Sequence, residues 1–170
     1  LPPVVQLMPG EQQEVALTLH PPRSPESKAG RYSLTVRVLS RDNPSQFVDV
    51  RIALTVGTFS QFQSSLQPQK VRAGRPTRVT VRNHGNFPDT FTISGNDRGN
   101  ELTFEPPTAQ IQVPQGGSAS ADLRAEPIKR PFVGGPKSHP FVVNVTPSQG
   151  DAQQHAGELV SRGLIPPWVP

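Results

Sequence analysis

The side chains of this chain that could carry out chemistry are few and widely spaced. Its four histidines show no metal-ligand spacing, and a zinc or copper site needs three or four converging ligands. The chain contains no cysteine, which excludes thiol catalysis, iron–sulfur clusters and disulfides. We therefore expect no metal and no cofactor, and we expect the histidines in turns or on the surface. They are His20, His84, His139 and His155.

Acid and nucleophile patterns give little support for catalysis. No serine lies in a Gly-x-Ser-x-Gly motif, and we find none with a His and an Asp placed to activate it. Glu101 and Glu105 are spaced for one side of a strand, as in a glycosidase pair. Such a pair needs a cleft lined by sugar-stacking aromatics, and the chain has one Trp and one Tyr. Asp97 beside Glu101 resembles a calcium loop only loosely, because Arg98 interrupts it. We predict that the protein is not an enzyme.

A cluster of positive charge marks a candidate interaction surface. Such a stripe could bind a protein partner, anionic lipid or an anionic polymer of a cell envelope. No aromatic residues interleave with the charges, so we expect no nucleic-acid partner. An ordinary solvated sheet face is the alternative interpretation. The basic residues, which no acid interrupts, are Lys70, Arg72, Arg75, Arg78 and Arg82.

Strands must position these side chains. Apolar residues alternate with polar ones in residues 15–19, 32–38 and 48–56, and in shorter runs from Val79 to Val160. A period of two is typical of half-buried β-strands. The chain is rich in proline (21) and glycine (14), which separate these runs, and no stretch of a dozen residues has a helical period. We predict an all-β fold.

The chain also contains an internal repeat. When residues 7–21 are aligned with residues 113–127, at an offset of about 106, Leu17 falls on Leu123. Further along, Val36 falls on Val143 and Val38 on Val145. This period suits immunoglobulin-like sandwiches of about 100 residues. The sequence therefore predicts tandem immunoglobulin-like β-sandwiches, the first one partial.

The repeat predicts three parts of the chain. Residues 1–57 form the C-terminal half of a sandwich, residues 58–161 form a complete sandwich, and residues 162–170 form a Pro-rich juxtamembrane or linker tail. A half sandwich leaves an apolar face and two strand edges open to water. Either the missing strands lie upstream in a longer chain, which we favour, or a partner covers the face.

Several segments carry a resemblance to a known family. Residues 7–15, 29–36 and 78–93, the last containing Asn-His-Gly-Asn-Phe-Pro-Asp-Thr-Phe, resemble bacterial immunoglobulin-like domains of the alpha-galactosidase-associated type. Residues 129–141 resemble a stretch of tandem-domain envelope proteins of filamentous, high-GC bacteria, where it precedes a membrane anchor. The resemblance covers essentially the whole chain and implies spacer and attachment modules rather than one specific role.

The tail is consistent with that resemblance. Arg162 and Trp168 stand among apolar residues and prolines, as in a segment at a membrane interface, and a Pro-rich linker is the alternative. We predict a non-catalytic spacer or protein-interaction module of a bacterial, membrane-anchored envelope protein, with its domains outside the cytoplasm. One alternative is an accessory domain of a carbohydrate-active enzyme. The other is an assembly subunit whose partner completes the half sandwich by strand addition. The oligomeric state is left open.

Overall fold

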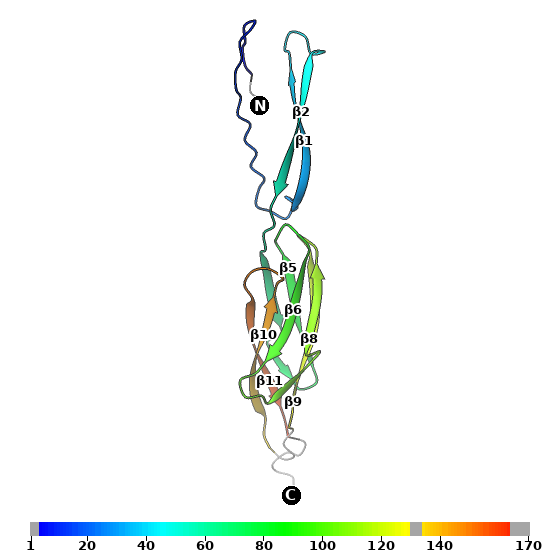
Figure 1. Cartoon of the computed structure of the whole chain (residues 1–170). Helices are drawn as coiled ribbons and strands as arrows, with labels where there is room; N and C mark the ends of the chain where they lie inside the picture. The colour runs from blue at the N-terminus through cyan, green and yellow to red at the C-terminus, as the bar shows by residue number, and fades with distance from the viewer. Residues whose placement is uncertain (1–3, 130–133, 164–170) are drawn as a thin grey trace.

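The computed structural model describes residues 4–129 and 134–163 of the chain. These residues form strands, turns and extended segments without a helix, which confirms the predicted all-β fold. The molecule is elongated, with a two-stranded hairpin at one end and a two-sheet sandwich next to it (Figure 1). The fold is an all-β sandwich of the immunoglobulin-like type.

The hairpin is formed by β1 (Gly30–Leu39) and β2 (Phe47–Val56). The two strands pair antiparallel from Gly30 opposite Val56 to Leu39 opposite Phe47, and this two-stranded sheet has no third strand. Both strands contain several β-branched residues, β2 more than β1, and such residues suit an extended, pleated backbone.

Residues 4–22 are extended apart from a turn at Pro9 and Gly10, and none of them is part of a sheet, so the strand expected at residues 15–19 is not formed. The reason is the lack of a ladder partner. The corresponding segment of the repeat, β9 (Ser118–Pro127), is paired on both sides, with β5 (Pro76–Asn83) and with β7 (Leu102–Glu105). An alternating sequence becomes a strand only when its backbone groups find such partners.

The sandwich consists of two sheets. One sheet has the order β3-β5-β9-β7, in which β3 is Phe62–Gln67. The other has the order β4-β11-β10-β6-β8. All neighbours in both sheets are antiparallel except β4 and β11, which are parallel. The strands of the second sheet are β4 (Lys70–Arg72), β6 (Asp89–Asn96), β8 (Thr108–Val113), β10 (Lys137–Thr146) and β11 (Gln153–Ser161).

The core lies between these two sheets, because every strand contributes its alternate residues to it. Val79 and Val81 from one sheet and Val143 and Val145 from the other are completely buried. Two glycines leave space for aromatic rings in this core. A Cβ at Gly157 would lie 2.4 Å from the ring of Phe141, and one at Gly95 would lie 2.3 Å from that of Phe104. These positions therefore need glycine for packing.

The two hairpins of the chain share one register. In β1–β2, Gly30 lies opposite Val56 and Val38 opposite Val48. In β10–β11, the repeat equivalents Lys137 and Ser161 are paired, and so are Val145 and Gln153. The structure is thus compatible with a tandem arrangement whose first sandwich is partial. The division of the chain into three parts stays a prediction.

Candidate protein-binding face

The hairpin presents an apolar surface that nothing in the described chain covers. We call this surface the open face. It is defined by four exposed residues that lie on the same side of the hairpin, Tyr32, Val38, Val48 and Val50. Val38 is 63% exposed, whereas its repeat equivalent Val145 is 0% exposed. The two valines occupy the same place in matching hairpins. Val38 is more exposed because no second sheet of the described chain packs against the β1–β2 hairpin.

A second row of exposed apolar residues lies on the extended segment 4–22. Leu17 is 55% exposed, whereas its repeat equivalent Leu123 is 1% exposed. Val15 and Leu19 are exposed as well. Contiguous exposed apolar surface of this kind marks interaction sites or aggregation hazards in folded proteins.

Both strands of the hairpin also have a free edge. β1 and β2 pair only with each other, whereas β10 pairs with β6 and β11 pairs with β4. A free edge carries unpaired N–H and C=O groups that can form a ladder with another strand. The hairpin thus offers an apolar face and two hydrogen-bonding edges together.

The open face is held onto the sandwich by Asn86, which is 2% exposed. The Asn86 side-chain oxygen accepts a hydrogen bond from the Phe59 backbone N–H at 2.8 Å. Its amide group donates to the carbonyls of Ser27 at 2.9 Å and Gly57 at 2.8 Å. The Ala29 N–H also donates to the Asn86 carbonyl, at 3.0 Å. One buried side chain therefore connects the loop before β1, the link after β2 and the sandwich.

Asn83, three residues earlier, has a matching role inside the sandwich. Its amide donates to the carbonyls of Phe87 and Val113, and its oxygen accepts from the Gly85 N–H. Residues 83–86, Asn-His-Gly-Asn, have the composition of an ordinary turn. The two asparagines instead satisfy backbone groups that would otherwise be buried without partners.

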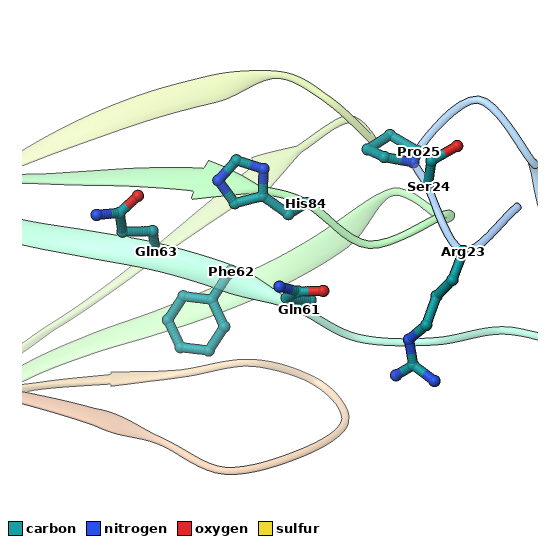
Figure 2. A pocket seen from close by; sticks show the side chains of 7 residues that line it. All are labelled: Arg23, Ser24, Pro25, Gln61, Phe62, Gln63 and His84. Atoms are coloured by element: carbon teal, nitrogen blue, oxygen red, sulfur yellow. The ribbon is translucent and has the colours of Figure 1, made fainter.

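A pocket lies at the same junction (Figure 2). Its walls come from the loop before β1, which supplies Arg23, and from β3 and the turn containing His84. The Arg23 guanidinium lies 4.7 Å from the centre of the Phe59 ring, an attractive cation–π distance. The pocket therefore depends on the junction that Asn86 holds.

The structure corrects two sequence-based expectations at the far end of the sandwich. His139, expected on the surface or in a turn, is 6% exposed. Its Nδ1 lies 2.6 Å from a Glu101 carboxylate oxygen and its Nε2 lies 3.1 Å from the Ser161 hydroxyl. A serine, a histidine and an acid thus do meet. Sequence reasoning missed them because three segments distant in the chain supply one each.

This Ser161–His139–Glu101 arrangement is structural rather than a site for a substrate. Ser161 is only 3% exposed, so its hydroxyl cannot reach a bound molecule. The hydrogen bond from His139, followed by that from Lys137, holds the pKa of the Glu101 carboxyl below its usual range. The cluster satisfies polar groups at the ends of β10 and β11.

The five basic residues do not form one continuous stripe on one sheet. Lys70 and Arg72 lie on β4, whereas Arg78 and Arg82 lie on the outer side of β5, in the other sheet. Arg78 forms a bidentate pair with Asp122, at 2.8 and 3.2 Å, and Lys70 lies 3.3 Å from Glu158. The interaction surface made of Lys70, Arg72, Arg75, Arg78 and Arg82 stays a prediction.

The membrane-interface segment falls largely outside the described residues. Arg162 is exposed just after β11, and Trp168 lies outside the described residues. Within residues 4–129 and 134–163, no helix has the length and apolarity that a bilayer crossing requires.

Comparisons with known proteins give structural neighbours only. No family model and no curated protein matches the chain. The periplasmic chaperone SfaE is 14% identical, with a TM-score of 0.43, and the match covers 64% of this chain and 60% of that one. The E. coli chaperone DraB is 13% identical with a TM-score of 0.41, covering 60% and 55%. The PapD-like domain 7 of human CEP192 is 11% identical with a TM-score of 0.36, covering 59% and 84%.

These findings correct the expected resemblance. The chain spans about 60% of the length of the first chaperone chain. The neighbours are periplasmic chaperones and a PapD-like domain, not alpha-galactosidase-associated domains of envelope proteins, and no family model supports the latter. That resemblance, drawn from residues 7–15, 29–36, 78–93 and 129–141, is wrong.

Proposed function

We propose that the protein is a non-catalytic protein-binding module whose open face takes up a partner polypeptide by β-strand addition. The observation that carries this proposal is the contrast between Val38, which is exposed, and Val145, which is completely buried at the same place in the matching hairpin. The location outside the cytoplasm expected from the sequence stays part of the proposal.

The free energy of burial supports such binding. Burying the seven exposed Val, Leu and Tyr side chains named above, in the hairpin and in segment 4–22, would contribute roughly 10–21 kcal/mol, at about 1.5–3 kcal/mol each. This is comparable with the cost of association, which lies at roughly 4–15 kcal/mol. Main-chain hydrogen bonds at the two free edges of the hairpin would add to the affinity and would fix the direction of the bound strand.

The test uses the full chain and one defined probe, a separate polypeptide with the sequence of residues 58–113. That segment contains β6, which pairs with β10, and β4, which pairs with β11. We expect binding by isothermal titration calorimetry. The double substitution Val38→Asp with Val48→Asp, on the open face, should weaken binding at least about a hundredfold, because each charge would be buried without a partner.

The matched control places aspartate on the outer side of the same strands, with Ser33→Asp and Arg51→Asp. Both residues are exposed. This control should bind the probe as the unmodified chain does. The proposal fails if the probe does not bind, or if the two double variants lose affinity equally.

The hydrogen bonds of Asn86 favour a second role, that of a spacer. A buried asparagine with three partners across a junction restricts the orientation of the two parts it joins. A spacer between a binding partner and another body needs such a restriction. The Asn86 variant described in the Discussion tests this role.

A further inference from the structure

We infer that the polypeptide bound by the open face presents an antiparallel strand to the free edge of β1 and a parallel strand to the free edge of β2, as half of an immunoglobulin-like sandwich does. This inference rests on the proposed function, and it names the kind of partner that the face fits.

The matching register of the two hairpins is the first step. Because the Gly30–Val56 pair corresponds to the Lys137–Ser161 pair, each residue of β1 has a fixed equivalent in β10. By this correspondence, Thr35 takes the place of Val142 and Leu39 takes the place of Thr146. The surroundings of β10–β11 therefore predict what surrounds β1–β2 residue by residue.

The strands beside β10 and β11 give the directions. β6 runs antiparallel to β10, with Asn96 opposite Val142 and Thr92 opposite Thr146. A partner strand at β1 should therefore place its Asn96 equivalent opposite Thr35 and its Thr92 equivalent opposite Leu39. β4 runs parallel to β11, with Lys70 opposite Glu158. The same correspondence puts a short parallel strand beside Ala53–Thr55 of β2.

The apolar pattern fixes the composition of the added strand. Phe91 and Ile93 of β6 are buried and alternate with Thr90 and Thr92, which are not. A strand that continues the sheet beyond β1 must likewise bring large apolar residues at alternate positions, so that they pack beside Val38.

A second copy of this chain does not fit this description. Its β6 is already paired on both sides, by β10 and β8, and its β4 is paired with β11. Supplying these strands to another molecule would break its own sandwich. The occupant is therefore a half sandwich that lacks its last three strands.

The test is disulfide trapping, because the chain contains no cysteine and every introduced thiol is unique. The full chain carries Thr35→Cys or Leu39→Cys. The probe, a polypeptide of residues 58–113, carries Asn96→Cys or Thr92→Cys. All four combinations are mixed under mild oxidation, and the cross-linked fraction is measured by mass spectrometry. A full chain with Arg82→Cys, on the outer side of β5, is the control for random collision.

The antiparallel arrangement predicts cross-links for Thr35→Cys with Asn96→Cys and for Leu39→Cys with Thr92→Cys. The swapped pairs would lie about 14 Å apart, since four residues of a strand span that length. A disulfide needs Cα atoms within about 7 Å. We therefore expect the swapped pairs to stay at the level of the Arg82→Cys control.

The outcomes separate the two proposals. Cross-linking of the swapped pairs would mean parallel addition and would overturn this inference. Equal yields from all four combinations, or binding without any cross-link, would overturn it as well, while the proposed function would stand. Absence of binding in calorimetry would overturn both.

Discussion

Replacing Asn86 with alanine removes the three side-chain hydrogen bonds that connect the loop before β1, the link after β2 and the sandwich. Each such bond contributes about 1 kcal/mol net, so the junction should lose about 3 kcal/mol. Water can replace these bonds once the junction opens. The loss should therefore appear as opening of the junction rather than as unfolding of the sandwich.

The reporter for this opening is the Ala29 N–H, which donates to the Asn86 backbone carbonyl and keeps its partner in the variant. Hydrogen exchange at Ala29, measured by NMR, should become roughly a hundredfold faster in Asn86→Ala, since about 1.4 kcal/mol corresponds to a factor of ten. The midpoint of urea denaturation of the sandwich should change little.

Asn83→Ala is the matched control, because Asn83 is the same residue type, is also 2% exposed, and makes three hydrogen bonds within the sandwich. It should destabilise the sandwich by about 3 kcal/mol. Its effect on exchange at Ala29 should not exceed what that general loss of stability produces. Unchanged exchange at Ala29 in Asn86→Ala would refute the reasoning, and with it the spacer role.

Three further predictions concern the sandwich and the open face. The pKa of Glu101 lies below its ordinary value of 4.5, so its stabilising contribution is present at neutral pH and is lost as the pH falls through the acid range. In the Glu101→Gln variant the melting temperature should therefore fall less steeply as the pH is lowered through the acid range. The same steepness as in the unmodified chain would contradict this. Gly157→Ala should cost about 1–3 kcal/mol in urea denaturation, because its Cβ would lie 2.4 Å from a buried ring, whereas Gly57→Ala, with open space around it, should be neutral. Val145→Ala should cost about 2 kcal/mol, whereas Val38→Ala should change stability by less than about 0.5 kcal/mol in the chain without a partner; equal losses would mean that the open face is covered.

Much of the fold could be predicted from local pattern. The alternation of residues 32–38 and 48–56 indicated the two strands of the hairpin, and the repeat aligned Val38 with Val145, as the shared register of the hairpins also does. The alternation at residues 15–19 is just as clear, yet no strand forms there. Alternation of apolar and polar residues indicates which segments could form a strand. Whether such a segment pairs depends on the strands available elsewhere in the molecule.

The candidate site was less accessible from the sequence. The apolar face of the hairpin is exposed because the strands that would cover it are not in residues 1–57. The internal repeat could show this, because it aligns those residues with only half of the second sandwich. The role of Asn86 could not be read in the same way, because its partners Ser27 and Gly57 lie in another part of the chain. The contact between Ser161, His139 and Glu101 was missed for the same reason. Contacts across distant segments leave no spacing signal.

The pairing distances along the chain have a consequence for the order of folding. Partners in β1 and β2 are near neighbours in the sequence, from Leu39 with Phe47 to Gly30 with Val56, whereas Lys70 of β4 must find Glu158 of β11. Local pairs form faster than distant ones, and during synthesis the earlier segment emerges first. The hairpin can therefore pair before β4 finds β11, the last strand of the sandwich to be made. We expect a partner to be able to bind the nascent chain, so that the open face and the free edges are covered while the ribosome is still completing the sandwich.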